Sequence, residues 1–284
     1  MTNREQQALA NFETVVDEAE AYYDSDDADN FYFNIWGGED IHIGLYDLTD
    51  DIAKASRFTV QEMARIASPI VESTKVLDIG AGYGGAVRQL AKAYGCHVTC
   101  LNLSRTQNAT NNRLTKQEGL EGLIDVVHGN FENIPAADDS FDLVWSQDAI
   151  LHSAHREDVI HEVLRVLKAG GKFVFTDPMQ SDTCPEGVLQ NVYDRIHLKN
   201  LGSFAFYRAT AREAGFIERH ISNRTDQLLA HYSRVREELQ SQYDRMVQLS
   251  SKSYVDNMNT GLMHWISAAK KGYLAWGVMC FEKK

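Results

Sequence analysis

The sequence predicts one α/β domain with a mostly parallel sheet and helices on both faces. Short apolar segments alternate with amphipathic helical ones between residues 75 and 178, a pattern typical of right-handed strand–helix–strand crossovers. A glycine-rich turn follows the first of these apolar segments. No stretch of the 284 residues resembles a linker long enough to separate two domains. Ligands of such a fold bind beyond the carboxyl ends of the strands.

Residues 1–68 are expected to form an N-terminal helical cap. Residues 8–28 have the pattern of a helix, and acidic residues accumulate toward its end. Residues 30–47 are rich in aromatics and glycine, which favours an ordered loop. Apolar residues at helical spacing predict a second helix over about 50–67, which Pro69 stops.

Residues 69–178 are expected to form the ligand-binding core. Helices are predicted at 85–94, at 105–118 and over "REDVIHEVLRVLK", where "AGG" ends the last of them. Five strands are predicted, at "KVLDIG", "HVTCLNLS", "IDVVHGN", "FDLVWS" and "KFVFTDP".

The C-terminal part is expected to complete the sheet and cover the site. Residues 209–225 and 271–284 supply a closing helix and two strands, the last of them "GYLAWGVMCFEK". Residues 179–208 and 226–270 are insertions on the substrate side, and the stretch 227–271 is polar and helical.

Charge and composition exclude several classes of protein. The formal net charge of −12 argues against nucleic-acid or anionic-membrane partners, and it suits solubility or a surface hydrated at high salt. No run of about 18 apolar residues and no signal-peptide core is seen, so we expect a cytoplasmic protein. The four cysteines form no CxxC pair and predict free thiols without a metal site.

The glycine-rich turn "VLDIGAGYGG" predicts a nucleotide site. Gly80, Gly82 and Gly84 satisfy GxGxG, and with Gly85 the turn also satisfies GxGxxG, between an expected strand and an expected helix. No lysine follows the glycines, which excludes a phosphate-binding loop of the GxxxxGK[ST] kind. A dinucleotide and S-adenosylmethionine both remain as ligands.

Asp78 favours the second of these ligands. A carboxylate two residues before the first glycine would repel a pyrophosphate, whereas S-adenosylmethionine carries an ammonium and a sulfonium. Alternatively, Asp78 is structural and accepts hydrogen bonds from the loop amides. The next strand ends in Asn102, whose amide can bond ribose hydroxyls. Asn130 and Phe131 follow the third strand, where they could meet the edge and face of an adenine.

Four ordered segments resemble class I S-adenosylmethionine-dependent methyltransferases, which have a Rossmann-like fold. The resemblance covers about 75–177 and the closing strands, and it includes "VLDIGAGYGG", "FDLVWSQDAILH" and "RVLKAGGKFVFTDP". Nearly the whole chain resembles sarcosine/dimethylglycine N-methyltransferases, through "NIWGGEDIHIGLY", "WSQDAILHS", "DRIHLKNLGSFAFYR" and "KKGYLAWGVMCFEKK". Phosphoethanolamine N-methyltransferases share much of this pattern.

The closer resemblance implies S-adenosylmethionine-dependent N-methylation of sarcosine and N,N-dimethylglycine to glycine betaine, a compatible solute. It implies a small amine as partner, no nucleic acid, no membrane, and a monomer or a dimer. The cofactor residues that it implies are Tyr32, His42, Ile43, Asp78, Gly80, Ala81, Gly82, Gly84, Asn102, Leu103, Gln107, Asn130, Phe131 and Gln147. Asn102 and Asn130 depart from the acids that are more usual at these places.

The attacking nitrogen must be neutral, and His152 is the candidate base because it titrates near neutral pH. If "QDAILHS" is helical, Asp148 lies four residues before His152 on the same face and could orient its ring or hold the ammonium. An ordinary capping aspartate and surface histidine are the alternative. The resemblance adds Tyr23, at a functional tyrosine of the cap.

A quaternary ammonium product cannot donate a hydrogen bond, so aromatic faces are its natural container. Tyr22 and Trp36 of the cap and Trp145 of the fourth strand are the candidates. The substrate carboxylate needs a cation and hydroxyl, which Arg195, Arg208 and Tyr207 could supply. A phosphate needs the same residue types, so phosphoethanolamine stays an alternative acceptor. A nicotinamide dehydrogenase and a catalytically silent binding module are the alternatives outside this class.

Overall fold

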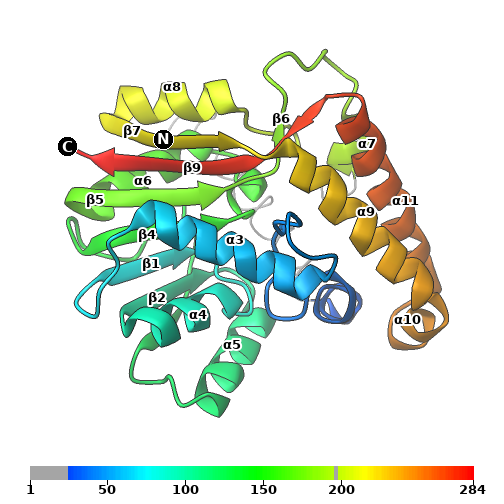
Figure 1. Cartoon of the computed structure of the whole chain (residues 1–284), viewed down its shortest axis with the longest axis horizontal. Coiled ribbons are helices and arrows are strands. Elements are labelled where there is room, and N and C mark those ends of the chain that lie inside the picture. Colours follow the sequence, from blue (N-terminus) through cyan, green and yellow to red (C-terminus); the bar gives the residue numbers. More distant parts are fainter. Residues whose placement is uncertain (1–24, 195–197) are drawn as a thin grey trace, which may run out of the picture.

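The computed structural model describes residues 25–194 and 198–284, and its centre is a seven-stranded sheet (Figure 1). The strand order is β3-β2-β1-β4-β5-β9-β7, and strands β1 to β5 run parallel to one another. Strand β9 lies antiparallel to β5 and β7, which makes the sheet mostly parallel, as predicted. The strands are β1 (Lys75–Ile79), β2 (His97–Asn102), β3 (Ile124–His128), β4 (Phe141–Gln147), β5 (Leu167–Thr176), β7 (Phe216–Asn223) and β9 (Gly277–Lys283).

Helices cover both faces of the sheet. On one face α3 (Ile52–Ala67) and α4 (Gly85–Tyr94) share an apolar core with β1, β2 and β4, and Arg88 Nη1 donates to Asn111 Oδ1 of the neighbouring α5 (Arg105–Gln117) at 3.0 Å. On the other face α6 (Arg156–Val166) and α8 (Phe204–Ala214) pack on β4, β5 and β9. Their buried residues recur at helical spacing, as Val159 and Val163 show.

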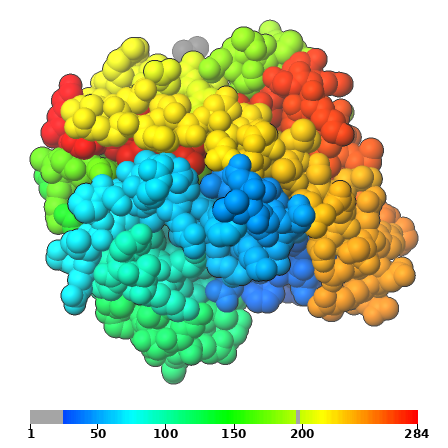
Figure 2. Space-filling model, in the orientation of Figure 1, coloured from blue at the N-terminus to red at the C-terminus, as the bar shows by residue number. Residues whose placement is uncertain are grey.

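A third apolar core joins the N-terminal cap to the C-terminal helices. Its largest side chains come from segments far apart in sequence, among them Trp36, Tyr232 and Trp265. Figure 1 shows α9 and α11 beyond the carboxyl ends of the parallel strands, and Figure 2 shows the cap residues filling the space beside them. The elements concerned are α2 (Asp26–Phe31), η1 (Tyr32–Trp36), α7 (Gln190–Tyr193), α9 (Thr225–Ser241), α10 (Tyr243–Leu249) and α11 (Lys252–Lys270).

Two local predictions need correction. The aromatic segment from residue 30 begins as helix, because α2 continues into the π-helical turn η1, and only from Gly37 is it irregular. The helix expected to reach Lys168 ends at Val166, and Leu167 already pairs with Phe141 as part of β5. Most of the helix expected at 8–28 lies outside the described residues.

The closing segment forms two strands rather than one. Strand β8 (Leu274–Ala275) pairs with β6 (Met179–Gln180), and β9 starts after Trp276. The backbone of Trp276 bonds to the start of α9 instead of a strand, since its N–H donates to Thr225 Oγ1 at 3.2 Å and its carbonyl accepts from Arg224 at 2.8 Å. The polar stretch 227–271 is helical, as predicted.

In the parts of the chain that the structure describes, no helix is both long and apolar enough to cross a lipid bilayer. The same residues contain no group of His, Cys, Asp and Glu side chains arranged to bind a metal ion. The four cysteines are free thiols, three of them buried, as their spacing predicted.

Candidate functional site

The candidate site lies at the carboxyl ends of β1, β2, β4 and β5. Strand β1 lies between β2 and β4, so the loops after β1 and β4 leave the sheet on opposite sides. Open α/β sheets bind ligands in the crevice that forms at this change of direction. The cap, in particular the segment from Gly37 to Tyr46, crosses this edge.

The loop after β1 is a backbone cradle. Gly80, Gly82 and Gly84 have φ values of 87°, 53° and 77°, which side-chain-bearing residues rarely adopt. A Cβ on Gly80 would lie 2.4 Å from the Cβ of Ala149 in the loop after β4. The N–H of Gly80 and that of Ala81 donate to Leu101 O, at 2.8 and 3.3 Å, which ties the cradle to β2. The cradle therefore depends on glycine for both its turn and its space.

Asp78 sits beneath this cradle with 3% of its surface exposed. Burial raises its pKa to about 7, and the neighbouring His42 opposes the shift. A buried carboxylate of this kind gains most from a cationic ligand, because the ligand replaces the lost solvation of the charge. Its environment therefore fits the ammonium of S-adenosylmethionine.

Asn102 and Gln107 meet at the end of β2, where the ribose was expected. The Asn102 side chain accepts from Gly82 N at 3.3 Å and donates to Gln107 Oε1 at 3.2 Å. Leu103, half-buried, follows directly. In the next loop Asn130 accepts from Glu132 N at 2.9 Å, and Phe131 comes within 3.9 Å of the position of a Cβ on Gly80.

Gln147 ends β4, beside the cradle. Its Oε1 accepts from Trp145 Nε1 at 2.9 Å, whereas its Nε2 is buried and has no acceptor among the described residues. A buried amide donor without a partner is costly, so this atom favours a ligand with an acceptor group. The glycine cradle, Asp78 and Gln147 together fit the methionine end of S-adenosylmethionine.

The cap is joined to the loop after β4 through Asp148. Its two oxygens accept from Ile43 N at 2.6 Å and from Trp276 Nε1 at 2.8 Å. His42 is buried next to it, with Nε2 3.6 Å from Asp40 Oδ1. Burial alone would lower the pKa of His42, but the nearby carboxylates of Asp40 and Asp148 raise it. The cap thus places a buried histidine beside Asp40 and Asp148.

His152 lies at the end of the 3₁₀ turn Ile150–His152, half-buried. The prediction that Asp148 and His152 share one helical face is wrong, because Asp148 precedes the turn with a φ of 52° and bonds to the cap. Asp148 therefore positions the cap, and the proposed part of His152 as base does not depend on it.

Aromatic side chains line the interface between the cap and the C-terminal helices. Tyr232 and Trp265 stack with centroids 4.8 Å apart, and Trp36 meets Tyr232 edge-on at 5.5 Å. Tyr32 packs beside Trp36 at 5.4 Å. The Nε1 of Trp265 is buried without an acceptor among the described residues. Large aromatic faces and one unpaired indole N–H are therefore gathered at one place.

Several predicted substrate residues lie elsewhere. Trp145 is fully buried in the core beneath α3 and α4, because its side chain leaves β4 on that face of the sheet. Arg208 is exposed and pairs with Glu218 at 2.8 Å, several residues before the end of β7. These positions do not support a role at the carboxyl edge. Tyr22, Tyr23 and Arg195 lie outside the described residues.

Tyr207 is fully buried, and its hydroxyl, predicted to meet the substrate, donates to Asp177 Oδ2 at 2.6 Å. Asp177 follows β5 and also accepts from Leu151 N at 2.9 Å. Burial raises the pKa of Asp177 to about 7, against the Tyr207 hydrogen bond and the charge of Arg156. Tyr207 therefore supports the turn that carries His152.

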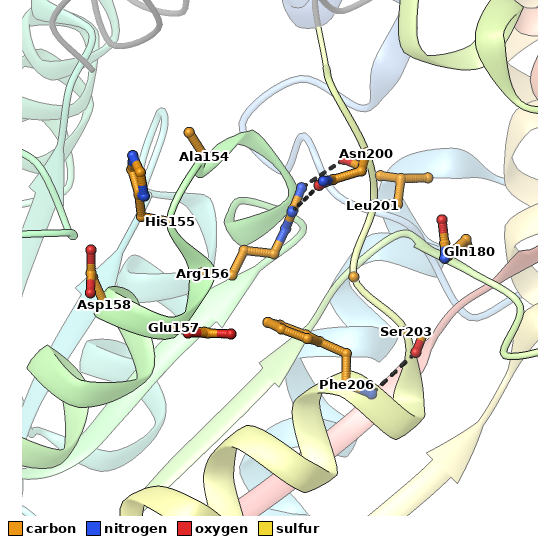
Figure 3. Close-up of a pocket in the computed structure, with 11 residues that line it drawn as sticks. Ala154, His155, Arg156, Glu157, Asp158, Gln180, Asn200, Leu201, Ser203 and Phe206 are labelled. Atoms are coloured by element: carbon orange, nitrogen blue, oxygen red, sulfur yellow. Dashed lines mark hydrogen bonds between the residues drawn. The ribbon is translucent and has the colours of Figure 1, made fainter. Parts of the chain in front are cut away.

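A pocket of about 400 Å³ adjoins this turn, between the N-termini of α6 and α8 (Figure 3). Arg156 lies at its centre and points to Asn200, where Nη1 donates to Oδ1 at 2.6 Å. His155, Glu157, Gln180 and Phe206 also line it. Acidic and basic groups are mixed there, so its charge favours no single class of ligand.

Sequence reasoning missed the residues that reach the site from distant segments. Trp276 stands in the quoted segment "GYLAWGVMCFEKK", and Trp265 belongs to an apolar helical series with Met258 and Leu262 that the polarity of 227–271 concealed. Asp177 stands at the end of the predicted strand "KFVFTDP", a position that marks ligand edges in this fold. These signals were present, but only the fold brings them together.

Known proteins match both the core and the whole chain. A family model described as "Methyltransferase domain" matches residues 77–175. The sarcosine/dimethylglycine N-methyltransferase of Halorhodospira halochloris is 50% identical over 94% of this chain and 96% of its own length. The sarcosine/dimethylglycine N-methyltransferase of Aphanothece halophytica is 50% identical over 97% of this chain and 100% of its own length.

Solved structures agree on the fold. A Galdieria sulphuraria protein assigned as a sarcosine dimethylglycine methyltransferase superposes with a TM-score of 0.87 at 41% identity, over 93% of this chain and 99% of its own. A Haemonchus contortus phosphoethanolamine N-methyltransferase superposes with a TM-score of 0.82 at 20% identity, over 95% of this chain and 60% of its own. At this identity the likeness shows the fold alone. The relatives cover the cap and the C-terminal helices as well as the core. The chain belongs to the class I S-adenosylmethionine-dependent methyltransferases, in the sarcosine/dimethylglycine N-methyltransferase family.

Proposed function

We propose that this protein transfers methyl groups from S-adenosylmethionine to the nitrogen of sarcosine and of N,N-dimethylglycine, and so makes glycine betaine. The observation that carries the proposal is 50% identity across 94% of the chain, because it includes the cap and α9 to α11. The generic methyltransferase match ends at residue 175, before the elements that contribute Trp265 and Trp276. The choice of acceptor depends on those elements.

S-adenosylmethionine supplies a methyl group already activated by the positive charge on its sulfur. The residues of this chain have to hold it, exclude water and align the acceptor. Gly80 and Gly82 provide the space, and Asp78 and the unpaired Nε2 of Gln147 suit the ammonium and carboxylate of the methionine part. Asn102 lies beside Gly82, where a ribose would follow.

The acceptor nitrogen has to lose its proton before it attacks. An alkylamine titrates near pH 10, so keeping it neutral at pH 7 costs roughly 4 kcal/mol. A histidine at the site lowers this cost by taking the proton, and an apolar pocket lowers it by disfavouring the ammonium. His152 stands at the edge that holds the cofactor groups, with Leu151 in the aromatic core beside it. His152 is therefore the proposed base.

The aromatic interface is the proposed container for the methylated nitrogen. Faces of Trp and Tyr stabilise a quaternary ammonium without any hydrogen bond. The stacked pair Tyr232–Trp265 and the neighbouring ring of Trp36 supply such faces. The unpaired Nε1 of Trp265 is a donor suited to the substrate carboxylate.

A substrate screen read by product mass tests this function. The purified protein is incubated with S-adenosylmethionine and, separately, glycine, sarcosine, N,N-dimethylglycine and phosphoethanolamine. We expect dimethylglycine to gain one methyl group and sarcosine to gain two. Methylation of phosphoethanolamine, with both glycine derivatives unchanged, would overturn the proposal.

A further inference from the structure

The backbone of Leu151, the residue before His152, is held by an ionisable side chain at its N–H and by another at its C=O. Leu151 N–H donates to Asp177 Oδ1 at 2.9 Å, and Leu151 O accepts from Arg156 Nη2 at 2.7 Å. Asp177 is fully buried and Arg156 has 8% of its surface exposed. Both hydrogen-bonding groups of this one residue are therefore fixed by buried ionisable side chains.

Each of these two side chains is fixed in turn. Asp177 Oδ2 accepts from the Tyr207 hydroxyl at 2.6 Å. Arg156 donates to Asn200 twice, to Oδ1 at 2.6 Å and to O at 2.8 Å, in the view of Figure 3. The supports come from the end of β5, the start of α6, α8 and the segment before α8. Four parts of the core thus converge on the turn that carries His152.

The turn itself is short. It is a single 3₁₀ turn, closed by His152 N to Ala149 O at 3.1 Å and Ser153 N to Ile150 O at 2.9 Å. Such turns have poor hydrogen-bond geometry and seldom persist alone. On the far side, Ser153 Oγ donates to Glu132. Buried charges are costly, and well-packed apolar residues could often fill the same space without loss of stability. Their presence here points to orientation rather than packing.

We propose that Asp177 and Arg156 are positioning residues that hold the His152 ring in register with the acceptor nitrogen by clamping the backbone N–H and C=O of Leu151. The inference rests on the part of His152 as base. A reacting group displaced by about 1 Å can lose roughly 100-fold in rate, so the clamp acts on kcat rather than on cofactor affinity.

Three variants and a matched control test the clamp. Asp177→Asn removes the charge and keeps the size, Tyr207→Phe removes only the supporting hydroxyl, and Arg156→Met removes the bond to Leu151 O. Arg165→Met is the control, because Arg165 is on the same helix and also donates to two main-chain carbonyls, Ile134 O and Ala136 O, away from the turn. We expect Asp177→Asn and Arg156→Met to lower kcat about 10- to 100-fold, with the Kd of S-adenosylhomocysteine and the kcat of Arg165→Met nearly unchanged.

A double-mutant cycle separates this inference from the proposed role of His152. If Asp177 acts through His152, Asp177→Asn lowers kcat in the wild type and has little further effect in a His152→Ala background. If Asp177→Asn lowers kcat equally in both backgrounds, or does not lower it in the wild type, the proposed role of Asp177 is wrong. The proposed role of His152 as base is unaffected by that result. If His152→Ala has the kcat of the wild type, His152 is not the base. If Asp177→Asn does not bind S-adenosylhomocysteine, Tyr207→Phe takes its place in the cycle, with the same outcomes.

Discussion

The two halves of the site are built differently. The cofactor half consists of backbone and short polar side chains that follow directly after strands, such as the glycine cradle, Asn102 and Gln147. The proposed acceptor half consists of large aromatic side chains brought together from the cap, α9 and α11. The first needs an exact turn of the chain, and the second needs only faces of suitable size. The first half therefore identifies the donor, and the second determines the acceptor.

The largest effect should come from His152, the proposed base between the two halves. We expect His152→Ala to lower kcat by about 100-fold or more while the Kd of S-adenosylhomocysteine stays close to that of the wild type. Steady-state kinetics and calorimetry measure the two quantities. His161→Ala is the control, since His161 lies exposed on α6. A wild-type kcat in His152→Ala would rule the histidine out as base.

In the cofactor half, a change that disturbs the backbone of the glycine cradle should weaken cofactor binding. A Cβ on Gly80 would clash with Ala149 and would require a φ of 87°, whereas Gly170 has a similar φ of 75° and nothing within 4 Å of its Cβ position. Both alanine variants carry backbone strain, of about 1 to 3 kcal/mol. Only Gly80→Ala should also weaken cofactor binding, by about tenfold or more. Equal Kd values for the two variants would mean that the cradle does not touch the cofactor.

Asp78 should make cofactor binding depend on pH. Its pKa is raised to about 7, and a cationic ligand binds the ionised form, so affinity should fall as the pH drops from 8 to 6. In Asp78→Asn, titration of S-adenosylhomocysteine should show weaker binding and a flatter dependence on pH. An unchanged slope would assign the pH dependence to another group.

The smallest effect should come from Arg208, which the sequence suggested as a carboxylate ligand. The structure places its guanidinium in an exposed pair with Glu218, away from both halves. Exposed pairs of this kind contribute little to stability. We expect Arg208→Ala to leave the KM for dimethylglycine nearly unchanged. A KM raised tenfold or more would return this residue to the acceptor half.

Sequence could predict the cofactor half because its information is local. Strand, glycine turn and helix follow one another within about 20 residues, so the position of Asp78 relative to the cradle is set by the chain itself. The parallel core of the sheet and both helical layers also follow from alternation and handedness. The break at Trp276 could not be predicted, because it depends on bonds to Arg224 and Thr225 at the start of α9.

For the proposed acceptor half, sequence could predict the type of residue but not the particular residues. The chemistry of a quaternary ammonium suggests aromatic residues, but Trp145 and Trp36 look alike as sequence, and only the fold buries one beneath α3 and brings the other to Tyr232. The same holds for arginine, since Arg208 and Arg156 differ in what surrounds them rather than in type. Contacts between distant segments decide these assignments.

The division of the site is tested most directly by titrating dimethylglycine into the protein saturated with S-adenosylhomocysteine, in the wild type and in Trp265→Leu. Phe216→Leu is the control, because Phe216 is a buried aromatic at the start of β7. We predict that Trp265→Leu weakens dimethylglycine binding about tenfold, from lost cation–π and carboxylate contacts, and leaves S-adenosylhomocysteine affinity within about twofold. Unchanged dimethylglycine binding, or an equal loss of both ligands, would contradict it.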